Sequence, residues 1–171
     1  MLSEKMREAL NVQINKEIYS AYLYLSMATY FESVNLTGFA NWQKVQAQEE
    51  MVHALKFYGY VNERGGKVDL QAIEAPPTTW ESALAVAEHT LQHEELVTSL
   101  INGLVKLARE EDDYASESFL KWYIDEQVEE EAAAGAVVEK IKLAGDKGGG
   151  IFLLDRELGA RVFTPPPATD K

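Results

Sequence analysis

Apolar residues recur along this chain at intervals of three and four, the spacing that places side chains on one face of an α-helix. The pattern is sustained over four long segments and then over one short one. It predicts helices at about 3–33, 38–64, 79–109, 114–144 and 151–158. Ser3 suits the N-cap of the first helix, and Gly65 and Gly66 suit the end of the second. Four long helices with a short fifth predict an all-α fold, a four-helix bundle.

The connections between these segments indicate how the helices are ordered. Short breaks near 34–37 and 112–113 predict antiparallel neighbours. Residues 65–79 contain two glycines and Pro76-Pro77, and their brief apolar alternation is too short for a sheet. We expect a long extended crossover there, between the second and third helices. The whole chain, 1–171, is expected to form one domain, with the bundle at about 3–144 and a disordered tail at about 164–171.

Each apolar stripe is interrupted near the middle of its helix by acidic or amide residues. The interrupting residues are Glu17, then Glu50 and His53, then Glu94, and finally Gln127 and Glu130. The midpoints of bundle helices share one height whichever way each helix runs. We therefore expect these side chains to converge at the centre of the core.

Burying such a group of carboxylates has a clear energetic consequence. An unpaired carboxylate in an apolar core costs several kcal/mol and tends to take up a proton. Bound cations are the natural compensation, and an oxygen-rich set with one imidazole and no sulfur suits iron or manganese, with zinc as a competitor. Two metals fit if Glu50 bridges them, with Glu17 and His53 completing one site and Glu94 and Glu130 the other. Di-iron bundles have a Glu-x-x-His motif on two helices, and this chain departs from that pattern on its fourth helix.

Composition narrows the range of partners. The chain has 171 residues and a formal net charge of −12, which opposes nucleic-acid binding and favours cations. The absence of cysteine excludes disulfides, iron–sulfur clusters and zinc ribbons. The first residues do not form a signal peptide, and no apolar run is long enough to cross a bilayer. We expect a cytoplasmic protein with no membrane partner.

Three stretches, Asn11 to Tyr24, Gln48 to Ala54 and Phe119 to Glu131, carry a family resemblance. Over nearly its whole length the chain resembles the prokaryotic non-haem ferritins. The resemblance implies an iron store in which dioxygen or peroxide oxidises Fe(II) at a di-iron ferroxidase centre. The ferric mineral would be kept in a hollow homo-oligomeric shell, usually of 24 subunits.

The resemblance also assigns roles to residues outside the central set. Tyr24 matches a tyrosine beside the centre that supplies an electron, and Trp122 matches an aromatic residue next to it. A third iron site is implied near Glu49, Glu126 and Glu129. These three glutamates lie off the apolar stripes, so a plain acidic surface explains them as well.

Several residues also have simpler interpretations. Tyr24 could be core filler, and Gln127 could hydrogen-bond a ligand instead of binding metal. Met51 matches the haem-binding methionine of bacterioferritins, but those proteins carry a histidine where this chain has Glu130. Packing is therefore the preferred role for Met51, and haem is not expected. His93 lies one residue off its stripe and is expected on a subunit surface, without a ligand role.

Two other classes of function compete with storage. A di-iron oxidase or peroxidase of the same superfamily would need a substrate pocket beside the metals, and rubrerythrin-type peroxidases use a cysteine-bound iron that this chain lacks. A DNA-protecting mini-ferritin is opposed by the acidic charge. The short helix at 151–158 has little room in a four-helix core, so we expect it to pack at a subunit junction.

Overall fold

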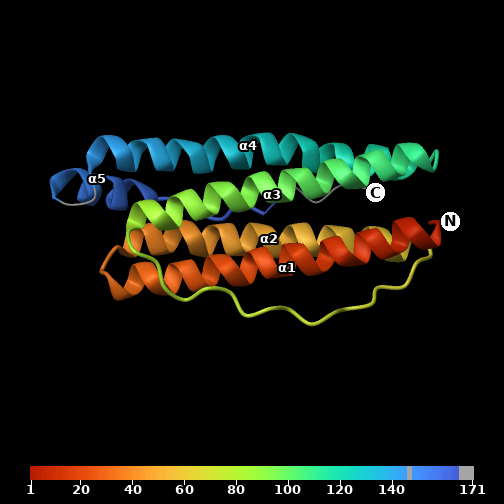
Figure 1. Cartoon of the computed structure of the whole chain (residues 1–171), viewed down its shortest axis with the longest axis horizontal. Helices are drawn as coiled ribbons and strands as arrows, with labels where there is room; N and C mark the ends of the chain where they lie inside the picture. The colour runs from red at the N-terminus through yellow and green to blue at the C-terminus, as the bar shows by residue number, and fades with distance from the viewer. Residues whose placement is uncertain (146–147, 166–171) are drawn as a thin grey trace.

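Four long helices run lengthwise through the computed structural model, which describes residues 1–145 and 148–165 (Figure 1). The helices are α1 (Glu4–Ser33), α2 (Thr37–Glu63), α3 (Ala83–Glu110), α4 (Tyr114–Ala144) and the short α5 (Gly149–Leu158). No strand occurs within the described residues. The predicted all-α bundle with a fifth helix is confirmed.

Short turns join α1 to α2 and α3 to α4, so each pair is antiparallel and the pairs form two layers (Figure 1). Each turn contains a residue in the left-handed region, Asn35 with φ 59° and Asp112 with φ 53°. Asn and Asp tolerate this conformation better than other residues with a Cβ. The polar breaks in the sequence therefore reverse the chain where they were predicted to.

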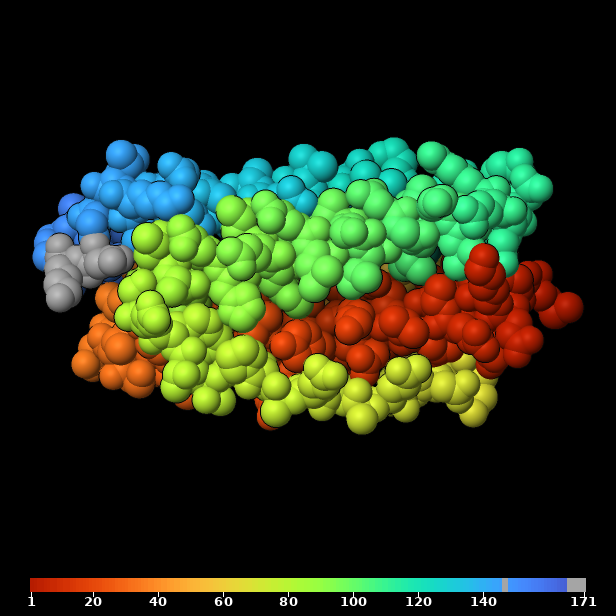
Figure 2. Space-filling view, viewed as in Figure 1, coloured from red at the N-terminus to blue at the C-terminus, as the bar shows by residue number. Residues whose placement is uncertain are grey.

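An extended crossover of about the predicted length links the pairs along the outside of α1 (Figures 1 and 2). The Asn11 side chain fixes it, since Nδ2 donates to the Lys67 carbonyl at 3.1 Å and Oδ1 accepts from the Asp69 N–H at 2.8 Å. The next helix begins at Ala83, so its predicted start near Thr79 is wrong. Ser82 has an extended backbone, and its hydroxyl caps the Ala85 N–H at 3.1 Å.

The buried apolar side chains form two clusters separated along every long helix. One cluster contains Tyr24, Phe31 and Phe39 together with residues of α5, and the other contains Leu10 and Phe57. On each of the four helices the predicted polar residues fall between the positions that the two clusters occupy. The core is thus apolar at both ends and polar in the middle.

Helix α5 docks on the start of α2, which has no side-chain cap of its own. Asp155 Oδ1 accepts from the backbone N–H groups of Gly38 at 2.8 Å and Phe39 at 3.0 Å. A Cβ on Gly38 would lie 1.6 Å from the Asp155 carbonyl oxygen, so only glycine permits this approach. Within the described residues, no helix is long and apolar enough to cross a membrane. From residue 166 on, the predicted disordered tail lies outside the described residues.

Candidate metal centre

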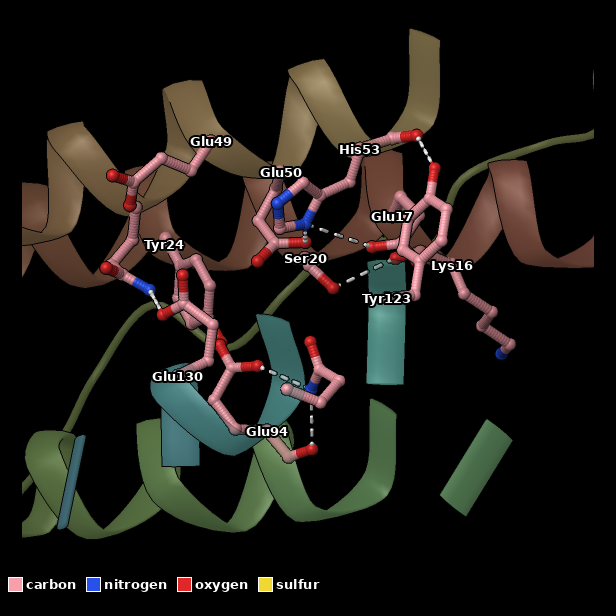
Figure 3. A network of polar contacts seen from close by, with 12 residues as sticks. Lys16, Glu17, Ser20, Tyr24, Glu49, Glu50, His53, Glu94, Tyr123 and Glu130 are labelled. Atoms are coloured by element: carbon pink, nitrogen blue, oxygen red, sulfur yellow. Dashed lines mark hydrogen bonds and ion pairs between the residues drawn. The ribbon is translucent and has the colours of Figure 1, made fainter. Parts of the chain in front are cut away.

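Glu17 of α1 and Glu50 and His53 of α2 meet in the middle of the bundle (Figure 3). All three are buried, and each offers a ligand atom within 4.8 Å of the others. His53 Nδ1 lies 3.5 Å from Glu50 Oε2 and 3.9 Å from Glu17 Oε2. The three-residue spacing of Glu50 and His53 places both on one helix face. The α1–α2 pair therefore presents two carboxylates and an imidazole to one point.

One oxygen of each carboxylate in this group lacks a hydrogen bond. Glu17 Oε2 and Glu50 Oε2 are buried with no hydrogen bond, whereas Glu17 Oε1 accepts from Gln13 Nε2 at 2.8 Å. Burial, and then the nearby Glu50 carboxylate, raises the pKa of Glu17 well above its ordinary value. Burial likewise raises the pKa of Glu50, and the charge of Glu94 adds to it. Two orphaned oxygens beside an imidazole fit a bound cation.

Glu94 of α3 and Glu130 of α4 approach the same central region from the opposite pair of helices (Figure 3). Glu94 Oε1 accepts a hydrogen bond from the Tyr24 hydroxyl, and Oε2 accepts from Gln127 Nε2 at 3.2 Å. Glu130 Oε2 accepts from Gln46 Nε2 at 2.8 Å. Burial, and then the charge of Glu130, raises the pKa of Glu94 to about 7. Among the described residues, only Glu17, Glu50 and His53 form a group of three candidate ligands this tight.

Tyr24 of α1 is fully buried, and its hydroxyl points across the bundle at Glu94 of α3 (Figure 3). The ring of His93 meets it edge-on at 5.8 Å, and His93 Nε2 lies 2.8 Å from Ser20 Oγ. His93 is only 9% exposed, so its predicted place on a subunit surface is wrong. The buried face of α3 is wider than one stripe, and Ser20 on α1 satisfies the imidazole. Burial lowers the pKa of His93 to about 4.

The glutamates of the implied third site are more open. Glu49 and Glu126 are partly buried and line one pocket of about 240 Å³ beside His53, whereas Glu129 is exposed. Glu49 Oε2 accepts from Arg161 at 2.7 Å. Burial raises the pKa of Glu49 to about 7, and Arg161 opposes that rise. Burial also raises the pKa of Glu126; His53 opposes that rise, and the charges of Glu130 and Glu129 add to it.

Aromatic side chains of α4 frame His53. The Trp122 ring meets the imidazole edge-on at 5.3 Å, and Lys56 Nζ lies 3.4 Å from the centre of the Trp122 ring. The Tyr123 hydroxyl donates to the His53 carbonyl at 2.8 Å, which ties α4 to α2 (Figure 3). Met51 lies on the outer face of α2 and is 40% exposed.

Sequence reasoning missed several residues that hold the candidate ligands. Gln13 orients Glu17, and Gln46 orients Glu130. Gln46 stands on the predicted apolar stripe of its helix, and an amide at such a position was a usable signal. Arg161 follows the last helix, and no pattern connects it with the centre of the bundle.

Known proteins resemble this chain over almost its full length. Residues 7–144 match the ferritin family, described as a ferritin-like domain. A bacterial non-heme ferritin of Bacteroides fragilis is 47% identical over 161 residues, which are 94% of this chain and 100% of that protein. A bacterial non-heme ferritin of Staphylococcus aureus is 40% identical and covers 95% of this chain and 98% of its own length. An open pore ferritin from Archaeoglobus fulgidus superposes with a TM-score of 0.94 at 55% identity, covering 95% of this chain and 100% of its own.

Proposed function

Because the chain belongs to the ferritin family, we propose that it oxidises Fe(II) at a di-iron centre in the middle of its bundle and stores the ferric product as mineral. Iron storage with ferroxidase activity is the function consistent with that family. One observation supports the proposal most strongly. The buried group of Glu17, Glu50 and His53 contains two carboxylate oxygens that no protein group satisfies.

The donor set favours iron over softer or harder metals. Two carboxylates and one imidazole suit a divalent ion of intermediate character such as Fe(II), Mn(II) or Zn(II). Of these, Fe(II) readily gives up an electron to dioxygen or peroxide. Gln13 holds the Glu17 carboxylate in place, and Tyr123 anchors the backbone at His53. The first ferrous ion therefore meets ligands that are already oriented.

A second ferrous ion would bind to Glu94 and Glu130, with Glu50 shared between the two ions. Two-metal sites generally hold their ions about 3.5–4 Å apart, so one dioxygen can take one electron from each. In this arrangement Gln127 acts through its hydrogen bond to Glu94. Tyr24, whose hydroxyl donates to Glu94, would supply an electron to the oxidation reaction at the centre. Glu49, Glu126 and Glu129 would receive iron on its way out of the centre.

Storage requires an enclosed volume, and we propose a homo-oligomeric shell, of 24 subunits as in the family, in the cytoplasm. Large apolar side chains remain exposed on the single chain, including Leu55, Leu96 and Val128. Such residues are typical of surfaces that subunits bury on assembly. The place of α5 at a subunit junction belongs to the same proposal.

A di-iron oxidase or peroxidase without storage is the second candidate. The pocket beside His53 favours it, because such an enzyme needs room for a substrate next to the metals. Two of the side chains lining that pocket are Glu49 and Glu126, however. Carboxylates suit a passing cation better than an organic molecule, so storage remains the better interpretation.

Anaerobic loading with Fe(II) followed by air separates the two candidates. Storage predicts rapid oxidation of two ferrous ions per subunit, continued uptake beyond that number, and co-elution of iron with a species of several hundred kilodaltons. An oxidase without storage predicts rapid oxidation by a small oligomer, with excess iron precipitating. Protein that binds no Fe(II) before air is admitted would contradict both candidates.

A further inference from the structure

The end of the described chain lies beside the candidate metal centre. After α5, residues 159–165, here termed the C-terminal strap, turn back along α2. Asn41 Nδ2 fixes the turn by donating to the carbonyls of Leu158 at 3.2 Å and Arg161 at 2.9 Å. Further along, Phe163 and Thr164 line the pocket that contains Glu49 and His53. The strap therefore forms one wall of the pocket beside the metal ligands.

Arg161 of the strap is the cation paired with Glu49. One guanidinium nitrogen donates to Glu49 Oε2 at 2.7 Å, and the other terminal nitrogen donates to Gln46 Oε1. The Arg161 side chain is 29% exposed and that of Glu49 is 21% exposed, so water screens the pair only in part. Arginine keeps its charge at any physiological pH. Glu49 thus has a partner within its own chain that is always positively charged.

Gln46 extends this contact toward the second half of the centre. It is buried, and its Nε2 donates to Glu130 Oε2 at 2.8 Å. A guanidinium only donates and a carboxylate accepts, so the Gln46 amide has a single orientation that satisfies both neighbours. Arg161, Gln46 and Glu130 consequently form one hydrogen-bonded chain from the strap to a candidate iron ligand.

We propose that Arg161 is an internal competitor for metal at Glu49: its guanidinium occupies the carboxylate when no ion is present, and a divalent ion that binds there displaces it. The inference rests on the proposed function, because it concerns iron that has left the two central positions. Because the Arg161 guanidinium competes for the Glu49 carboxylate, Glu49 and Glu126 bind that iron more weakly. Iron would therefore pass through this position and not block the exit from the centre.

Displacement of Arg161 would also affect the candidate ligand Glu130. When Arg161 leaves, the buried Gln46 Oε1 loses its donor, and a buried amide oxygen without a partner is unfavourable. The amide is then free to turn, which weakens its hydrogen bond to Glu130. Metal at Glu49 would thus be coupled to the ligand geometry at Glu130 through Gln46.

Calorimetric titration of the assembled protein with Zn²⁺, which is not oxidised, tests the competition. In Arg161→Gln the ions bound after the first two per subunit should bind about fivefold more tightly, the strength of a partly exposed ion pair. Arg156→Gln is the matched control, because it removes the same charge from an exposed position on neighbouring α5. It should leave every Zn²⁺ affinity unchanged, and Glu49→Gln added to Arg161→Gln should abolish the gain.

Unchanged or weaker Zn²⁺ binding in Arg161→Gln would overturn the proposal, and so would an equal gain in Arg156→Gln. If Arg161→Gln does not assemble, crystals of the unaltered protein with and without Zn²⁺ decide the matter. The proposal requires the Arg161 guanidinium to leave Glu49 in the zinc form, and a retained ion pair beside bound zinc would refute it. The first two Zn²⁺ equivalents test the proposed function separately, because their absence would contradict the di-iron centre whatever Arg161 does.

Discussion

The two halves of the candidate centre hold their carboxylates in different ways. In the α1–α2 half, Glu17 accepts one hydrogen bond, from Gln13, whereas Glu17 Oε2 and Glu50 Oε2 are buried beside His53 with none. In the α3–α4 half, Glu94 accepts hydrogen bonds on both oxygens and Glu130 accepts one from Gln46. The carboxylates of both halves are buried, so burial alone does not explain the difference.

This difference predicts an order of metal binding. An ion entering the α1–α2 half can bind Glu17 Oε2 and Glu50 Oε2, which accept no hydrogen bond, and can leave the Gln13 hydrogen bond to Glu17 Oε1 in place. An ion that binds Glu94 in the α3–α4 half competes with the hydrogen bonds from Tyr24 and Gln127, and each such exchange costs free energy. The α3–α4 half also has no imidazole, so it lacks a neutral nitrogen donor and should bind the ion more weakly. The first iron should bind at Glu17, Glu50 and His53, and the second less firmly.

The largest effect is expected from Glu50→Ala, because in the proposed centre both halves share this carboxylate. Loss of an outer partner of a metal ligand already costs about 10–100-fold in affinity, so loss of a shared ligand should cost more than 100-fold at each position. Anaerobic Fe(II) titration measures this directly. Glu63→Ala, an exposed change on the same helix, is the control. Retention of one tight ion in Glu50→Ala would show that Glu50 does not bridge the two halves.

Glu94→Ala should separate the halves and have the next largest effect. It removes a proposed ligand of the second ion but leaves Glu17, Glu50 and His53. One ferrous ion should still bind, the fast oxidation phase should fall about 100-fold, and slow mineral growth should continue. Stopped-flow absorbance after two ferrous ions per subunit follows each phase. An undiminished fast phase would remove Glu94 from the centre, and loss of all binding would show that the halves are not separable.

A smaller effect is expected on the stability of the metal-free protein as the pH changes. Glu94 has a pKa of about 7 in the fold against an ordinary value of 4.5. Between these values the folded chain binds more protons than the unfolded chain, so stability is present at low pH and is lost as pH rises through about 7. For Glu94 the loss is on the order of 1–3 kcal/mol. Glu49, with a pKa of about 7, should act in the same direction.

Urea unfolding between pH 5 and pH 8, with chelator and at one protein concentration, measures this loss. Zn²⁺ should reduce or reverse it, because metal takes the place of the protons on the carboxylates. Glu94→Gln is the matched control, since an amide does not titrate, and its slope should be shallower. Metal-free protein whose stability rises over this range would contradict the burial of uncompensated carboxylates.

Much of the fold could be predicted from the chain alone. The apolar spacing located the helices, and the polar interruptions at Glu17, Glu50 and Glu94 fell at one height because helix midpoints coincide in any bundle. The start of α3 was misplaced by four residues, since Ser82 and Thr79 are both acceptable caps and only the backbone of Ser82 decides between them. Metal binding at these residues stays a prediction.

The partners of the candidate ligands were harder to foresee. The contact between Gln46 and Arg161 spans 115 positions of the chain, and it depends on how α5 docks on α2. The burial of His93 depends on Ser20 of another helix. Periodicity describes one helix at a time, so it indicates which face is buried but not which neighbour satisfies a polar group on that face.

The central claim is that the two halves bind metal unequally, and anomalous X-ray scattering from crystals soaked anaerobically in less than one Fe(II) per subunit tests it most directly. We predict iron between Glu17, Glu50 and His53, with Glu94 still hydrogen-bonded to Tyr24 and Gln127. At two or more Fe(II) per subunit, the position at Glu94 and Glu130 should fill as well. Equal occupancy of both positions at the lowest loading, or earlier filling at Glu94 and Glu130, would contradict the account.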